Sequence, residues 1–187
     1  MKRKVVRLRH PSLEHYLNYG MSSYWPKSLN KVVKILTQKE MEKINLLVAF
    51  IKFLSDNSVF RFNIEDFRSR FKLQKYVFIA RFFGLDLGYS FSLYIHGPYS
   101  PDLAGDYYRL NCDIKEARLP EFRKEEFLRF IKGRDDKWLE IASTLLLIGE
   151  EVKNPEELIE MTLEVKPSFD ERKVRGVLEE LKAFNLL

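Results

Sequence analysis

The chain has 187 residues, of which 45% are hydrophobic and 32% are charged, and its formal net charge at pH 7 is +5. This composition is typical of a globular protein and excludes a disordered chain. No apolar run approaches the ~18 residues that a membrane span requires. The basic residues at positions 2–4 are not followed by the apolar run that is typical of a signal peptide. The single cysteine, Cys112, excludes an internal disulfide and favours a reducing cytoplasm.

Charge is divided unevenly along the chain. Residues 1–84 contain 17 basic and 6 acidic side chains, a net charge of +11, whereas residues 85–187 contain 15 and 21, a net charge of −6. Either the basic part faces a polyanion, or the two parts attract each other within one chain or in a dimer. Abundant lysine and glutamate with only two glutamines is a composition typical of thermophiles.

Residues 1–36 are predicted to form a basic and aromatic N-terminal arm. Residues 4–9 alternate as in a short strand, and residues 16–25 are typical of an irregular loop. The arm combines cations, which can contact phosphates, with rings that can stack on bases. The alternatives are an ordinary solvated terminus and a homodimer contact. The candidate nucleic-acid contacts in the arm are Lys2, Arg3, Lys4, Arg7 and Arg9.

Residues 37–187 are predicted to form a single helical domain. Thr37, with Glu40 three residues later, has the pattern of a capping box and predicts a helix that ends near residue 55. Asn63 is predicted to cap the next helix, 64–83, whose second half is apolar nearly all round. We expect this to be the buried central helix of the domain. A second face of the same helix adds three candidate nucleic-acid contacts, Arg68, Lys72 and Lys75.

Residues 89–96 alternate between apolar and polar side chains and predict a half-buried strand. A lone strand is unstable, so it requires a partner, for which segments 5–9 and 59–62 are candidates. Residues 97–99 are predicted to turn, and Ser100 is predicted to cap a helix that ends near Leu110. The polar and aromatic residues Tyr94, His96 and Tyr99 are candidates for partner binding; the alternative is that they only build the turn and the helix cap.

The C-terminal part is predicted to be helical, with helices at 122–131, 135–151 and 155–165 and a last helix that a capping box at 168–171 opens. A sub-boundary or loop is expected near 118–120. The last two helices resemble a helix-turn-helix, but four glutamates on the first of them would face phosphates unfavourably. We therefore expect a structural or partner-binding three-helix unit. The predicted fold class is mainly α (α+β), with a small two- or three-stranded β element.

A family resemblance begins at Lys72-Leu73-Gln74-Lys75 and the apolar run that follows. Next in order come Gly84-Leu85, Leu87-Gly88-Tyr89, Tyr94, Gly97-Pro98-Tyr99-Ser100, Leu103-Ala104, Lys166-Pro167, Phe169, Leu181 and Asn185-Leu186-Leu187. This set resembles the YwgA-like family of bacterial and archaeal proteins and is more distantly similar to the Panacea (SocA-like) antitoxin domain. The resemblance covers roughly residues 60–187. It implies a small, mainly helical cytosolic domain without an assigned reaction, and the antitoxin relatives imply protein binding or regulation.

The sequence contains no nucleotide-binding glycine motif, and no cofactor is expected. His10 and His15 have a proline between them, which argues against a shared metal-binding helix face, and Cys112 has no histidine near it in sequence. We therefore predict a non-enzymatic regulatory or adaptor protein of the cytoplasm whose basic N-terminal half contacts nucleic acid. The alternative is a protein–protein interaction module of the antitoxin type. A third alternative is an enzyme whose site is assembled from scattered residues.

Overall fold

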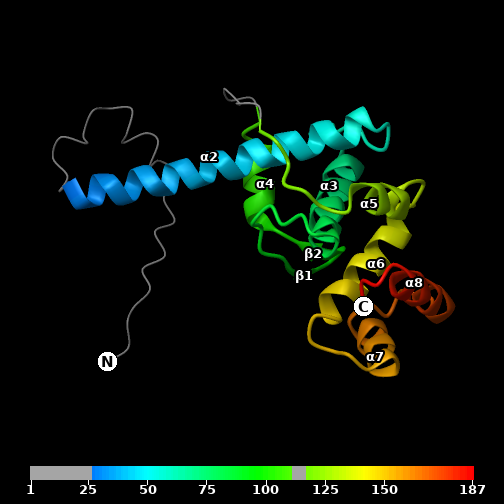
Figure 1. The fold of residues 1–187 in the computed structure, drawn as a ribbon. Coiled ribbons are helices and arrows are strands. Elements are labelled where there is room, and N and C mark those ends of the chain that lie inside the picture. Colours follow the sequence, from blue (N-terminus) through cyan, green and yellow to red (C-terminus); the bar gives the residue numbers. More distant parts are fainter. Residues whose placement is uncertain (1–26, 111–116) are drawn as a thin grey trace, which may run out of the picture. The chain divides into compact units, whose positions relative to one another are not determined.

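The computed structural model describes residues 27–110 and 117–187 (Figure 1), with side chains described from residue 38 onward. The chain divides into two compact units, Met1–Met41 and Glu42–Leu187. The described residues form seven α-helices, a short 3₁₀ helix and one two-stranded antiparallel sheet, so the mainly helical prediction is confirmed. The predicted strand at 4–9 and the irregular segment at 16–25 lie outside the described residues. No helix in the described ranges is both long and apolar enough to cross a membrane.

Helix α2 spans Lys27–Asp56, so the prediction that a helix starts after Thr37 is wrong. The sequence contains no glycine or proline anywhere between these two ends, and nothing therefore interrupts the helix at the capping-box pattern. Farther along the helix, residues spaced three or four apart are buried, as expected for a face that packs on a core. These residues are Ile44, Leu47, Phe50 and Leu54.

Helix α3 (Phe67–Ala80), extended by the 3₁₀ helix η2 (Arg81–Phe83), is the buried central helix that the apolar run predicts. Every residue from Leu73 to Ala80 is buried. The predicted start of this helix is wrong: Asp66, not Asn63, is the N-cap, and its carboxylate accepts hydrogen bonds from the backbone N–H groups of Arg68 and Ser69. The Asn63 side chain instead accepts a hydrogen bond from the N–H of Glu65.

The sheet is a hairpin of β1 (Ser92–Tyr94) and β2 (Gly97–Tyr99). The expected long strand at 89–96 is therefore wrong, and so is the turn predicted at 97–99, which is the pairing strand. Segment 59–62 is not a strand, and segment 5–9 lies outside the described residues. Gly97 explains the difference, because its φ of +81° lets the chain reverse directly after residues 95 and 96.

Helix α4 (Pro101–Tyr107) begins with the predicted Ser100 cap, and α5 (Lys124–Ile131) follows. The C-terminal unit consists of α6 (Asp136–Ile148), α7 (Pro155–Val165) and α8 (Glu171–Ala183), which pack against one another as predicted (Figure 1). Asp170, not Ser168, caps α8. Helix α6 also packs against α3 and β2, so it connects the hairpin to the C-terminal unit.

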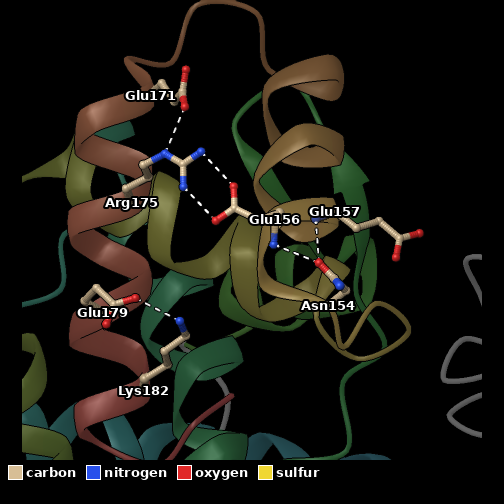
Figure 2. Close-up of polar contacts among 7 residues, drawn as sticks. All are labelled: Asn154, Glu156, Glu157, Glu171, Arg175, Glu179 and Lys182. Atoms are coloured by element: carbon tan, nitrogen blue, oxygen red, sulfur yellow. Dashed lines mark hydrogen bonds and ion pairs between the residues drawn. The ribbon is translucent and has the colours of Figure 1, made fainter.

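An exposed ion pair joins α7 and α8, and a side-chain cap begins α7 (Figure 2). The guanidinium of Arg175 in α8 binds both carboxylate oxygens of Glu156, at 3.0 and 2.8 Å, and Glu171 one turn earlier at 2.9 Å. Asn154 caps α7 by accepting hydrogen bonds from the N–H groups of Glu156 and Glu157. The first turns of both helices therefore carry acidic residues, of which two are already paired.

Candidate functional site

A pocket of about 280 Å³ opens between α3, the hairpin and the end of α4. We call it the aromatic pocket, because six of the side chains that line it are phenylalanine or tyrosine rings: Phe67, Phe71, Tyr94, Tyr99, Tyr107 and Tyr108. The remaining lining residues are Arg70, Gln74, Lys75, His96 and Gly97. All three residues predicted to bind a partner, Tyr94, His96 and Tyr99, therefore come together in one pocket.

Exposed aromatic and aliphatic side chains lie in the aromatic pocket and next to it in the chain. Of the lining residues, Phe67 is 57% exposed and Tyr94 61%; Ile95, which precedes His96 in the chain, is 69% exposed. The ring of Tyr94 lies 5.6 Å from that of Tyr99, and the ring of His96 meets Phe67 and Phe71 edge-on at 5.8 and 6.2 Å. Because these rings already contact one another, the surface that they present is largely formed before any partner arrives.

Gln74 joins the central helix to the strand that forms one wall of the pocket. Its buried side-chain amide accepts a hydrogen bond from the N–H of Ser100 at 2.9 Å and donates one to the C=O of the same residue at 3.0 Å. This pair satisfies both backbone groups at the point where β2 ends and α4 begins. The register between α3 and the hairpin is therefore fixed by a side chain within the Lys-Leu-Gln-Lys segment.

Lys75 lies behind the pocket and is only 2% exposed. Its Nζ donates a hydrogen bond to the C=O of Pro98 at 2.6 Å and lies 5.1 Å from the centre of the Phe71 ring. Burial lowers the pKa of Lys75 to about 7; the positive charge of Lys166 acts in the same direction, and Glu140 opposes it. The ammonium thus lies in a site where its charged form is disfavoured.

Lys166, just after α7, holds the other strand of the hairpin. Its Nζ donates hydrogen bonds to the C=O of Tyr94 at 3.1 Å and to the C=O of Ile95, and it forms an ion pair with Glu140 at 3.2 Å. Two buried lysines from distant parts of the sequence, one on α3 and one just after α7, therefore bind the hairpin backbone.

The residues predicted to contact nucleic acid do not line the aromatic pocket together. Arg68 and Lys72 both approach the carboxylate of Asp136, at 2.6 and 3.6 Å, and Lys75 is buried, so these three cations do not form one exposed basic face. The five arm residues, Lys2, Arg3, Lys4, Arg7 and Arg9, lie outside the described residues.

The sequence analysis did not identify five of the lining residues as site residues: Phe67, Arg70, Phe71, and Tyr107 and Tyr108 at the end of α4. Phe67 and Phe71 have the i, i+4 spacing of one helix face, which in the sequence is typical of a core face rather than of a pocket. Within the described ranges, no group of three or more His, Cys, Asp or Glu side chains is arranged to hold a metal ion.

A larger hollow of about 690 Å³ lies beside the ends of α6 and α8. Its walls mix aliphatic side chains with charges of both signs, Glu150, Lys153 and Lys182, and they lack the exposed rings of the aromatic pocket. The aromatic pocket is therefore the better candidate site. Comparison with protein-family models, curated proteins and solved structures found no match to this chain.

Proposed function

We propose that the protein is an interaction module that binds a segment of a partner protein by taking one of its side chains into the aromatic pocket. The observation that carries this proposal is the group of exposed apolar side chains around a pre-formed hollow. Contiguous exposed apolar surface is uncommon on monomers and is typical of interaction sites. Tyrosine and phenylalanine are enriched at such interfaces, where a few buried anchors supply most of the binding energy.

The chemistry of the rim favours a protein over a nucleic acid. Beside the lining residues in the hairpin sequence, the exposed Ile95 and Leu93 offer aliphatic surface, which has no counterpart on a phosphate backbone. On α3, Arg68 and Lys72 are already paired with Asp136, which leaves Arg70 and the buried Lys75 as the cations that line the pocket. Nucleic-acid binding through the N-terminal arm stays a prediction, as does the resemblance to the YwgA-like family and to antitoxin domains.

The test is a selection of phage-displayed random peptides on the full chain, followed by binding measurements with the enriched peptides. We expect the enriched sequences to share an aromatic residue. Tyr94→Ala should weaken their binding by about tenfold or more, since truncation of a central aromatic contact typically has this effect. Met161→Ala is the matched control, because it removes an exposed apolar side chain from α7, away from the pocket.

Two outcomes would contradict the proposal. In the first, the selected peptides bind Tyr94→Ala as well as the unchanged protein, which would place their site elsewhere. In the second, no peptide is enriched, whereas single-stranded DNA or RNA binds with an affinity that falls steeply as salt is raised. That salt dependence is the signature of phosphate contacts and would favour the nucleic-acid alternative.

A further inference from the structure

Two cations line the aromatic pocket without a carboxylate partner. The Arg70 guanidinium donates a hydrogen bond to the C=O of Ile64, and Lys75 donates one to the C=O of Pro98. Neither forms an ion pair with any acidic residue of the described ranges. Their neighbours differ in this respect, since Arg68 and Lys72 share Asp136 and Lys166 pairs with Glu140.

The buried ammonium of Lys75 is close to the wall of the pocket. Its Nζ lies 5.1 Å from the centre of the Phe71 ring, and a Cβ at Gly97 would lie 3.4 Å from it; both residues line the pocket. The negative charge of Glu140 compensates the Lys75 ammonium only in part, since burial still lowers the pKa of Lys75, and an incoming carboxylate would offset more of the cost of the buried charge. An anion at this wall would also meet no repulsion from lining residues, because none of them is acidic.

We propose that Arg70 and Lys75 form an anion subsite in the aromatic pocket, and that the partner segment carries a carboxylate next to an aromatic side chain. The rings would receive the aromatic side chain, and the two cations would receive the carboxylate. The pocket volume of about 280 Å³ is at the low end for ligand sites, which suits a single residue rather than a larger molecule. This inference rests on the proposed interaction function and specifies the partner that it would accept.

A matched pair of small probes isolates the carboxylate. N-acetylphenylalanine carries a carboxylate, and N-acetylphenylalaninamide carries an uncharged carboxamide of similar shape in its place. Each is titrated into the full chain near pH 6.5, and the backbone amide resonances of α3 and the hairpin are followed by NMR. We expect both probes to shift the pocket resonances and the acid to bind about tenfold more tightly, as a charge-assisted hydrogen bond allows.

Arg70→Gln should remove most of this preference for the acid while binding of the amide persists. Lys75→Met serves as a second variant, because it replaces the ammonium by an apolar side chain of similar length. Arg172→Gln is the matched control, because it removes the same charge from an exposed position on α8. It should leave the preference for the acid unchanged. Thermal melts confirm that each variant is folded before it is titrated.

The outcomes separate this inference from the interaction function. If acid and amide bind equally, and Tyr94→Ala weakens both, the anion subsite is overturned while the interaction function stands. A preference for the acid that survives Arg70→Gln also overturns the subsite. If neither probe shifts the pocket resonances, both proposals fail. A tighter response to phenyl phosphate than to N-acetylphenylalanine would overturn the carboxylate in favour of a phosphate.

Discussion

The Nζ atom of Lys75 lies 2.6 Å from the carbonyl oxygen of Pro98, so a side chain from the middle of the central helix holds strand β2. Gln74, the preceding residue, binds both backbone groups of Ser100 just beyond that strand. Lys166 does the same for β1 through the carbonyl oxygens of Tyr94 and Ile95. The hairpin that carries the candidate site is thus held by buried polar side chains as well as by apolar packing.

The first prediction concerns Lys75 and the pH dependence of stability. Its pKa is about 7 in the folded protein, below the ordinary value of 10.5, so between these two values the unfolded chain binds more protons. The free energy of unfolding should therefore rise with pH from about 7, by up to about 1.4 kcal/mol per pH unit for this one group. Urea titrations between pH 6.5 and 9.5 measure the slope.

Lys75→Met should remove that slope, since no titrating group remains at the position. Lys173→Met, an exposed position on α8, is the control and should keep it. Equal slopes in the unchanged protein and in Lys75→Met would show that Lys75 titrates normally in the folded state.

The second prediction uses the same titration to examine ligand binding. The affinity for N-acetylphenylalanine should fall as pH rises through about 7, because Lys75 loses the proton that attracts the carboxylate. The charged groups around Lys75 are Arg70 on its own helix, Glu140 on α6 and Lys166 after α7. His96→Gln should retain the fall in affinity and Lys75→Met should abolish it; a fall that disappears in His96→Gln would assign the effect to the histidine.

The third prediction separates two reasons for a glycine. At Gly97, φ is +81°, and an added Cβ would lie 2.9 Å from the Thr144 Oγ1 atom; at Gly88, φ is +77°, and no atom lies within 4 Å of such a Cβ. Gly88→Ala should cost only the left-handed backbone penalty, about 1–2 kcal/mol. Gly97→Ala should cost a further 1–3 kcal/mol or so for overpacking against α6. Chemical denaturation measures both, and equal losses would mean that the hairpin can move away from α6.

The fourth prediction concerns the Lys166–Glu140 ion pair. The two side chains are 8% and 13% exposed, so Lys166→Met should leave the largely buried Glu140 with only Lys137, at 3.6 Å, and should destabilise the protein by up to about 3–5 kcal/mol. Adding Glu140→Gln to Lys166→Met should recover part of that loss, because the incompletely compensated charge is gone. A double-mutant cycle measures the coupling; additive losses would show that the pair contributes little.

The fifth prediction is a small effect at the junction of α7 and α8. Arg175→Gln removes the contacts to Glu156 and Glu171, all of them at the surface (Figure 2). The melting temperature should fall by less than about 3 °C, and the difference should shrink in high salt, since exposed ion pairs are weak and screened. Arg172→Gln is the control. A large drop that is insensitive to salt would indicate that Arg175 holds the two helices together.

The sequence alone was sufficient for the helical fold class, the buried central helix, the Ser100 cap and the three-helix C-terminal unit. Each depends on signals that act over a few residues: apolar spacing around one helix, or a side chain that caps the next turn. Helix starts were less accurate where two capping residues were close together, as with Asn63 and Asp66. The start of α2 was missed because a capping-box pattern can also lie inside an uninterrupted helix.

Tyr94, His96 and Tyr99 are polar and aromatic residues close together in the chain, so the sequence identified part of the candidate site, although the strand predicted over residues 89–96 was wrong. Only the tertiary structure decided which strand pairs with β1, that Lys75 is buried while Arg68 and Lys72 meet Asp136, and that Phe67 and Tyr108 complete a pocket. The physical reason is that pairing, burial and charge compensation depend on residues far apart in sequence. From the sequence, Lys75 is expected to be a surface cation. Only the tertiary structure places its ammonium against the carbonyl oxygen of Pro98 and the ring of Phe71.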